Sequence, residues 1–131
     1  MKSTLFSLLL LSSAVLHANT LENMLELFQA GGAGPFSAEQ GRDAWARAII
    51  DKKSGKPRSC SDCHGDDPSK AGKHIKTGKR IEPMAPSANP ERLSDAKKID
   101  KWFKRNCKWT WGRVCTPQEK GDLLLYLQKY S

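Results

Sequence analysis

The stretch Cys60-Ser-Asp-Cys63-His64 decides how the rest of the chain is organised. Two cysteines separated by two residues and followed by histidine have the spacing that is typical of covalent haem attachment. The two thiols form thioethers with the haem vinyl groups, and the histidine then binds the iron on one side. We therefore predict one covalently bound haem c, attached through Cys60 and Cys63, with His64 as an axial ligand.

Half of a zinc site is the alternative interpretation of the same motif, with Cys107 and Cys115 as the other half. Paired zinc-binding cysteines are usually separated by about two to four residues. Cys107 and Cys115 are separated by seven. This spacing favours haem over zinc.

The N-terminus has the pattern of a secretory signal peptide. Lys2 precedes an apolar run, residues 5–11, and small residues follow up to Ala18. The apolar run is too short to span a bilayer. We predict a signal peptide over residues 1–18, with Ala14 as an alternative cleavage position, export to the periplasm, and one monohaem domain over residues 19–131.

The chain is strongly basic, with a net charge of +8. The charge becomes +7 once Lys2 is removed with the signal peptide. The sequence lacks the interleaving of aromatic and basic residues that is typical of nucleic-acid-binding modules, so we predict no nucleic-acid partner. The charge indicates either a solvated surface or attraction toward an acidic partner.

Export also bears on the two remaining cysteines. With Cys60 and Cys63 attached to haem, Cys107 and Cys115 are left as a pair in a compartment where disulfides persist. We predict a disulfide between them that closes a short loop and fixes the geometry of the residues beside it.

The distribution of apolar residues and capping residues predicts an all-α fold, with about four short helices around one haem. The expected helices are Thr20 to Ala30, a helix from Ser37 that includes Ile49, a helix opened by Ser94 that reaches Asn106, and a helix from Thr116 to Tyr130. Gly41 and Trp45 should cross Leu123, Tyr126 and Leu127 to form the main protein core.

Two segments between these helices, residues 51–59 and 65–90, are rich in Gly, Pro and Lys and predict irregular loops. A loop as long as the second is unusual inside a small domain. Haem supplies the core around which such a chain can pack. The candidates for binding the haem propionates are Lys73, Thr77, Lys79 and Arg80.

The sixth ligand of the iron determines the function, and three residues compete for it. Met84 would give an electron-transfer cytochrome. His74 lies in a Gly- and Lys-rich stretch and is expected at the surface. Asn106 follows Ile99, Trp102 and Phe103 on one helix face and precedes Cys107. An asparagine there is either a ligand or an ordinary helix-terminating residue.

The C-terminal part of the chain carries a family resemblance. The segments Arg105-Asn106-Cys107, Gly112-Arg113-Val114-Cys115-Thr116-Pro117, Glu119-Lys120 and Asp122-Leu123-Leu124 resemble the sphaeroides haem protein (SHP) family of oxygen-binding cytochromes c. Residues 77–79 and 85–92 resemble the matching parts of that family. The likeness covers nearly all of the chain after the signal peptide.

This resemblance implies a class I cytochrome c fold in which Asn106 is the sixth ligand in the oxidised state and leaves on reduction. The ferrous haem would then bind a small ligand such as O2 or NO. Electrons would come from partners such as a dihaem cytochrome c or a membrane cytochrome b. Met84 departs from the family pattern, where a non-sulfur residue is expected, and keeps a His/Met electron-transfer cytochrome as the alternative. A small reductase or peroxidase acting on the bound ligand is a third alternative, but the sequence shows no distal acid–base pair, so we do not predict an enzyme.

Overall fold

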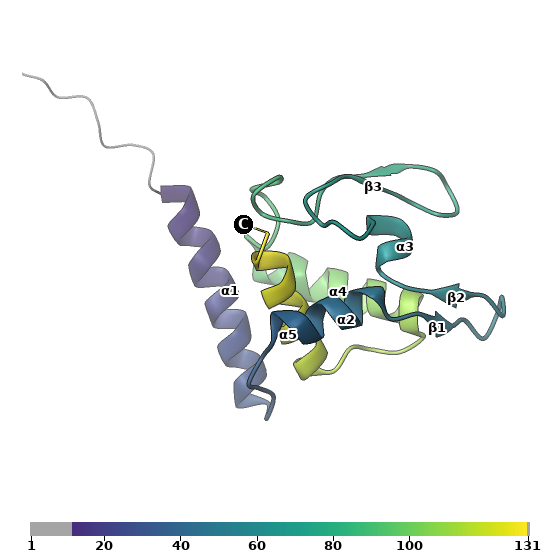
Figure 1. The fold of residues 1–131 in the computed structure, drawn as a ribbon. Helices are drawn as coiled ribbons and strands as arrows, with labels where there is room; N and C mark the ends of the chain where they lie inside the picture. The colour runs from purple at the N-terminus through teal and green to yellow at the C-terminus, as the bar shows by residue number, and fades with distance from the viewer. Residues whose placement is uncertain (1–11, 131) are drawn as a thin grey trace, which may run out of the picture.

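The computed structural model describes residues 12–130, with side-chain surroundings from Asn19 onward (Figure 1). Of the predicted signal peptide, residues 1–11 lie outside the described residues and residues 12–18 belong to the first helix. The elements follow in the order α1 (Ser12–Ala30), α2 (Ala38–Ala46), β1 (Ile49–Ile50), β2 (Pro57–Arg58), α3 (Ser61–His64), β3 (Gly72–Lys73), β4 (Arg80–Ile81), α4 (Ala96–Trp111) and α5 (Pro117–Gln128). The predominantly helical prediction is confirmed.

Local side-chain signals define the starts of α2 and α5. The Ser37 hydroxyl accepts a hydrogen bond from the Gln40 N–H at 3.3 Å. At α5, the Thr116 hydroxyl and the Glu119 carboxylate cap each other's backbone N–H groups, and Pro117 occupies the first helical position. These contacts satisfy N–H groups that have no partner inside a helix.

The second predicted helix is too long. It ends at Ala46, because Arg47 adopts an extended backbone with ψ of 115°. Ile49 and Ile50 instead form β1, which pairs antiparallel with β2. β-branched side chains favour extended backbone. The predicted loop 65–90 likewise contains a second short hairpin, formed by β3 and β4.

Helix α4 differs from its prediction at both ends. Asp95 rather than Ser94 is the N-cap, and its carboxylate accepts from the N–H groups of Lys97 and Lys98. The helix continues past Asn106 to Trp111 and ends at Gly112, whose φ of 70° is in the left-handed region that glycine adopts readily. Asn106 is therefore an interior helical residue. The interpretation of Asn106 as a helix-terminating residue is wrong.

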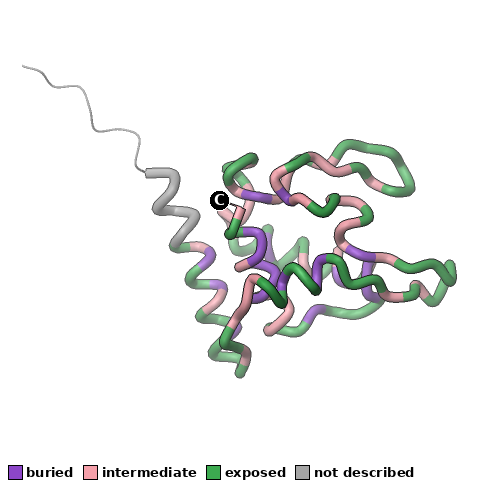
Figure 2. Tube along the Cα trace, in the orientation of Figure 1, coloured by how far each residue is buried: buried purple, intermediate pink, exposed green. Residues whose placement is uncertain are grey.

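The main core lies where α2 crosses α5, as predicted. Helix backbones approach so closely there that a Cβ at Gly41 would overlap the carbonyl oxygen of Asp122. Trp45, Leu123, Tyr126 and Leu127 are buried around this crossing. Figure 2 shows that most buried residues lie in the helices, whereas the hairpin strands are exposed or half-buried.

Helix α1 covers a second cluster beside the first. Its Leu21, Met24 and Phe28 pack against Ile99 of α4 and Leu124 of α5. The first predicted helix is confirmed with its end at Ala30, although α1 begins earlier than Thr20, at Ser12. In the described part of the chain, no helix is both long and apolar enough to cross a membrane.

Candidate haem site

The motif Cys60–His64 folds into a single helical turn. Cys60 is the N-cap of α3, and its carbonyl oxygen accepts hydrogen bonds from the N–H groups of Cys63 at 3.3 Å and His64 at 3.1 Å. Residues three apart in a helical turn lie on the same side. Cys60 and Cys63, both half-buried and with free thiols, thus share one side of the turn.

Contacts before and behind this turn hold it in place. Ser59 N–H donates to the Asp62 carboxylate at 2.7 Å, and Asp62 N–H donates to the Ser59 hydroxyl at 3.2 Å. Behind the turn, Gly72 of β3 lies so close that a Cβ there would overlap the Cys63 carbonyl oxygen. The first hairpin strand of the 65–90 segment thus supports the motif directly.

Two aromatic residues of the helical core hold the residues that follow His64. The Trp45 indole N–H donates to the Gly65 carbonyl oxygen at 2.8 Å. The Tyr126 hydroxyl donates to the Asp66 carbonyl oxygen at 3.3 Å. The Trp45 ring also lies 5.3 Å from the His64 ring, centroid to centroid. The sequence predicted Trp45 and Tyr126 only as core residues, so this positioning role was missed.

His64 is available as a metal ligand. Its Nδ1 is buried and has no hydrogen-bond partner within residues 12–130. Burial, with a smaller effect of the positive charge of Arg92, lowers the pKa of His64 to about 4. The imidazole is therefore neutral at pH 7, which is the form that binds metals. Burial also raises the pKa of the Cys60 thiol to about 12.

Arg92 is a further residue near the site that the sequence did not reveal as part of it. Its Nε donates to the Pro83 carbonyl oxygen at 2.9 Å and its Nη2 donates to the Glu82 carbonyl oxygen at 3.0 Å. These bonds fix the backbone immediately before Met84. Only tertiary structure brings the arginine to these carbonyls, although Arg92 belongs to the stretch that carries the family resemblance.

Met84 is held in place by both its backbone and its side chain. Its backbone N–H donates to the Pro68 carbonyl oxygen at 2.9 Å. Its half-buried side chain packs against the main core cluster, as do Cys60 and Phe103. An apolar thioether is satisfied by such packing alone.

Asn106 is in a different position. It is half-buried in the interior of α4, next to the buried Cys107. Across the described residues 12–130, the Asn106 side-chain amide makes no hydrogen bond. Its amide atoms are not among the fully buried, unpaired side-chain atoms of these residues, so the amide stays accessible and is free to bind a ligand.

Cys107 and Cys115 lie together at the end of α4. Their sulfur atoms are at disulfide distance and their Cα atoms are 5.6 Å apart. The geometry suits the predicted disulfide. Within residues 12–130, no three His, Cys, Asp or Glu side chains converge as a metal site, and the zinc alternative would need these two sulfurs beside Cys60 and Cys63.

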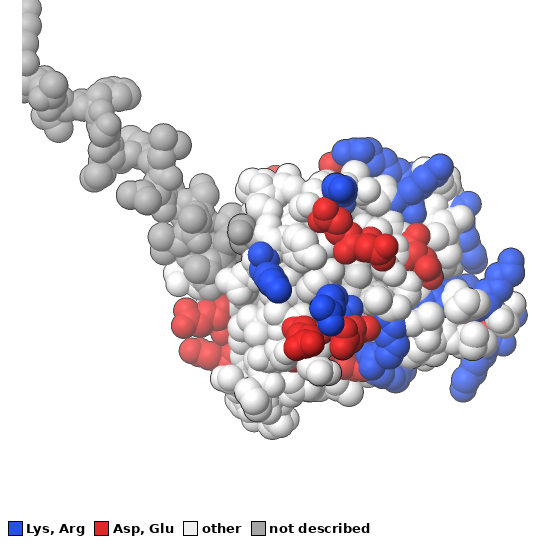
Figure 3. Space-filling model, viewed as in Figure 1, with Lys and Arg blue, Asp and Glu red and all other residues white. Residues whose placement is uncertain are grey.

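The candidates for propionate binding lie on the second hairpin and are all exposed: Lys73, Thr77, Lys79 and Arg80. Lys73 pairs with Arg80 across the strands, and Arg80 binds Glu82 at 2.8 Å. Lysine and arginine side chains gather over the two hairpins at the right of Figure 3. The structure brings these four residues to one surface but gives them no buried partner.

His74 is half-buried and is more engaged than a surface residue. Its Nδ1 accepts hydrogen bonds from the N–H groups of Lys76 and Thr77, each at 3.2 Å, and so stabilises the turn between β3 and β4. Nearby, the Trp109 ring lies between Arg58, at 4.2 Å, and Lys76, at 4.7 Å. The contacts of Trp109 with Arg58 and with Lys76 were not evident from the sequence, because they join segments that are distant in the chain.

The residues present fit a covalently bound haem. Two free thiols share one side of a helical turn, and the adjacent neutral imidazole has a buried nitrogen without a partner. Haem attachment would give the thiols and the imidazole their bonding partners.

Comparison with known proteins gives related cytochromes. A family model described as a domain of unknown function (DUF1924) matches residues 31–127. The cytochrome c-type protein SHP of Cereibacter sphaeroides is 45% identical over 102 residues, which cover 76% of each chain.

Solved structures agree with these relatives. The structure of oxidised SHP, described as an oxygen-binding cytochrome c, superposes with a TM-score of 0.73 and 41% identity, covering 82% of this chain and 94% of SHP. Oxidised cytochrome c'' from Methylophilus methylotrophus gives a TM-score of 0.76 and 31% identity, covering 86% of this chain and 96% of that one. The solution structure of the same cytochrome c'' is described in terms of haem-ligand detachment.

Proposed function

The chain belongs to the SHP family of monohaem c-type cytochromes, and from this premise we propose that it is a redox-gated ligand-binding protein. In the proposal, His64 and Asn106 hold the two axial positions of one covalent haem c in the oxidised state. Asn106 leaves on reduction and makes room for a small diatomic ligand such as O2 or NO.

Cys60, Cys63 and His64 carry the attachment. Bound haem supplies an iron centre that changes oxidation state and accepts two axial ligands. The two thiols fix the orientation of α3, and the low pKa of His64 keeps its imidazole neutral. Trp45 and Tyr126 limit the movement of His64 by binding the two backbone carbonyls that follow it.

The observation that supports Asn106 as the second axial residue is its unpaired side-chain amide. Met84, the competing residue, is satisfied by packing against the core. An amide that makes no hydrogen bond within the described protein can bind iron without breaking an internal contact. The helix-terminating explanation no longer competes, since α4 continues to Trp111.

The chemistry of a carboxamide accounts for release on reduction. A neutral amide oxygen is a weak, hard donor and suits ferric iron better than the softer ferrous iron. Once detached, the Asn106 amide also has an N–H donor with which it can hydrogen-bond a small ligand beside it. The haem-ligand detachment described for the related cytochrome c'' supports this behaviour.

A Cys107–Cys115 disulfide belongs to the proposal as a clamp on the helix that carries Asn106. The bond would join the last turns of α4 to the residue before Thr116, the N-cap of α5. We expect the Cys107→Ser/Cys115→Ser variant to change the ferric absorption spectrum more than the thermal unfolding temperature. An unchanged spectrum would argue against the clamp.

Export and partners complete the proposal. Residues 1–18 would direct the chain to the periplasm, where a disulfide persists. Electrons would come from other cytochromes, such as a dihaem cytochrome c or a membrane cytochrome b. The relative described as oxygen-binding supports a diatomic ligand.

The Asn106→Ala variant tests the function. Its ferric form should become high-spin or bind water, while its ferrous absorption spectrum should stay nearly unchanged. Met84→Leu is the matched control and should alter neither spectrum. If ferric Asn106→Ala stays low-spin and Met84→Leu abolishes a near-infrared sulfur-to-iron band, the protein is the alternative His/Met electron-transfer cytochrome. Absorption spectra of the reduced protein with and without carbon monoxide check ligand binding directly.

A further inference from the structure

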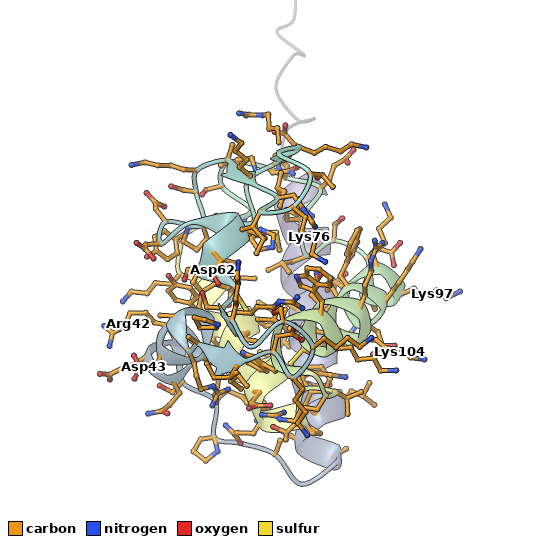
Figure 4. All side chains as sticks on the ribbon, turned by 90° about the vertical axis from the view of Figure 1, so that its right-hand side faces the viewer. Arg42, Asp43, Asp62, Lys76, Lys97 and Lys104 are labelled. Atoms are coloured by element: carbon orange, nitrogen blue, oxygen red, sulfur yellow. A yellow bond between two sulfur atoms is a disulfide. The ribbon has the colours of Figure 1, made fainter. Side chains whose placement is uncertain are left out.

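Helix α4 has an unusually basic outer surface. Its sixteen residues include one acidic side chain, Asp100. The basic side chains, which we call the basic face, are Lys97, Lys98, Lys101, Lys104, Arg105 and Lys108. Four of these side chains are spaced at i, i+4, i+7 and i+11 and so form one stripe along the helix: Lys97, Lys101, Lys104 and Lys108. Lys97 and Lys104 project away from the body of the molecule, on the side opposite Arg42 and Asp43 of α2 (Figure 4).

The basic face is not neutralised by the protein itself. Asp100, the acidic residue of α4, lies 3.6 Å from Lys120 of α5. The described residues 12–130 offer no ion pair to any of the six basic side chains. Arg105 instead lies over the Trp102 ring at 5.5 Å.

Helix stability does not account for this arrangement. Lys97 and Lys98 occupy the first turn, where the helix dipole disfavours positive charge. Like charges four residues apart, such as Lys97 with Lys101 and Lys104 with Lys108, destabilise a helix by mutual repulsion. The basic face therefore destabilises α4, and negative charges on a bound partner would reduce the repulsion among its lysines.

An apolar groove adjoins the basic face. It has a volume of about 670 Å³ and lies between α4 and the side of α1 that carries Met24, Leu27 and Phe28. Leu27 is 63% exposed. The opposite wall, from α4, is mostly basic, and it also includes the carboxylate of Asp100. The groove thus joins an apolar wall to a positively charged one.

We propose that the basic face and this groove form a docking surface for an acidic segment of a partner protein. Carboxylates of the partner would pair with the lysines, and an apolar side chain would enter beside Leu27. A concave surface with an apolar wall suits a protruding protein segment better than a flat anionic lipid layer. Asn106 lies on the same helix, so a partner docked there contacts the element that carries the candidate ligand.

This inference rests on the proposed function in one respect, namely that the docked partner is the electron donor. The docking itself does not depend on Asn106 binding iron. If Asn106→Ala shows another ligand while docking is observed, the surface stands and only its link to ligand release is lost. If Asn106 behaves as expected and no docking occurs, the surface alone is wrong.

The experiment uses the haem-loaded protein and a synthetic helical peptide that carries glutamates along one face and one central leucine. Calorimetry at low ionic strength should show binding that weakens steeply with added salt. The Lys101→Gln/Lys104→Gln variant should weaken binding about tenfold. Lys52→Gln/Lys53→Gln, on the exposed turn after β1, removes the same charge and should change affinity less than about twofold.

A second variant tests the groove separately from the charge. Leu27→Ser should weaken binding of the leucine peptide about threefold but leave binding of a serine-substituted peptide unchanged. Absence of peptide binding, or equal losses in both lysine variants, would overturn the proposal. Phosphatidylglycerol vesicles are the competing probe. If they bind with the same Lys101 and Lys104 dependence while the peptide does not bind, the surface recognises anionic lipid and the proposal is wrong.

Discussion

The helical core and the segment 47–95 differ in how they are held together. In α5, six of twelve residues are buried, against partners in α1, α2 and α4. Over residues 47–95, by contrast, the buried residues are Ser59, Pro68 and Ala85. The first region is stabilised by its own side chains. The second takes its position from short hairpins, from hydrogen bonds to the core and from a few half-buried side chains such as Met84 that pack against it, and haem would supply further packing.

Hydrogen bonds from the helical core to the segment 47–95 explain how that segment holds a defined position although few of its residues are buried. Trp45 and Tyr126 come from the crossing of α2 and α5, the most closely packed part of the described structure, and bind consecutive backbone carbonyls after His64. The helical core thus acts as a rigid support for the motif. Four experiments test this division, in order of decreasing expected effect.

Removing the thiols should separate the regions most clearly. In Cys60→Ala/Cys63→Ala, we expect no covalently attached haem, because no thioether can form. Haem staining on a denaturing gel measures the attachment. Hydrogen exchange should show that amides of residues 59–85 lose protection while those of α2 and α5 keep more of theirs. Equal loss in both regions would show that they form one cooperative unit, and a bound zinc ion would contradict the haem assignment.

Two glycines offer the same clash in the two regions. A Cβ at Gly41 overlaps a carbonyl oxygen of the core, and a Cβ at Gly72 overlaps the Cys63 carbonyl oxygen. We expect Gly41→Ala to lower the free energy of unfolding by about 1–3 kcal/mol with little spectral change. Gly72→Ala should mainly change the absorption spectrum, because it displaces the attachment turn. The reverse pattern in thermal unfolding and absorption would contradict the division.

Trp45→Phe tests one of the two hydrogen bonds. The variant keeps an aromatic ring but loses the indole N–H, so the free energy of unfolding should fall by about 1 kcal/mol. Tyr126→Phe removes the second hydrogen bond in the same way. Denaturant unfolding of both variants and of the double variant measures their coupling. If neither variant alters the spectrum or the stability, the core does not position His64.

Replacing Glu119, which caps α5, should give the smallest effect, and the effect should be limited to the helical core. Hydrogen bonding to Arg113, with help from the Thr116 N–H and Arg47, lowers its pKa from 4.5 to about 2. A carboxylate with a lowered pKa in the folded state stabilises the protein above the unfolded pKa, and this contribution is lost as pH falls from 4.5 toward 2. Above pH 4.5 we expect the free energy of unfolding of Glu119→Gln to be about 0.5 kcal/mol lower than that of the unmodified protein, and the difference should shrink as the pH falls toward 2.

Glu39→Gln serves as the control for the Glu119 experiment. Its carboxylate lies 3.8 Å from Arg42 at a highly exposed position, so its effect should be much smaller. The haem spectrum should be unchanged in both variants. If Glu39→Gln and Glu119→Gln alter the acid unfolding curve equally, the capping contacts of α5 do not explain its stability.

The parts of the fold that the sequence predicts are those with local causes. Ser37 and Thr116 mark helix starts because their hydroxyls bond to N–H groups three residues away. The polar Asn106 after an apolar stripe allowed a helix end there as one of two interpretations. The helix continues because the buried face of Ile99 continues through Cys107 and Thr110, and the helix ends at Gly112. Gly112 was a local signal for the true end.

The contacts of the site are harder to predict, because they join distant residues. The C-x-x-C-H spacing predicts the attachment residues by itself. Nothing local links Trp45 to Gly65, because this pair depends on how α2 packs against the segment after α3, and the bond from Arg92 to Pro83 depends on how an irregular loop folds back on itself. The structure likewise reveals that Asn106 is unpaired while Met84 is packed, and spacing alone could not distinguish them.

The contact between α2 and α5 also bears on the order in which the chain assembles. The hydrogen bond from Ser37 N–H to the Asp122 carboxylate joins residues 85 apart in sequence. Contacts of such long range form slowly, because a large loop must close first. A chain that emerges N-terminus first presents Cys60 and Cys63 well before Asp122 appears. The thiols are therefore reachable on an open chain, and arrival of the last helix closes the fold around them.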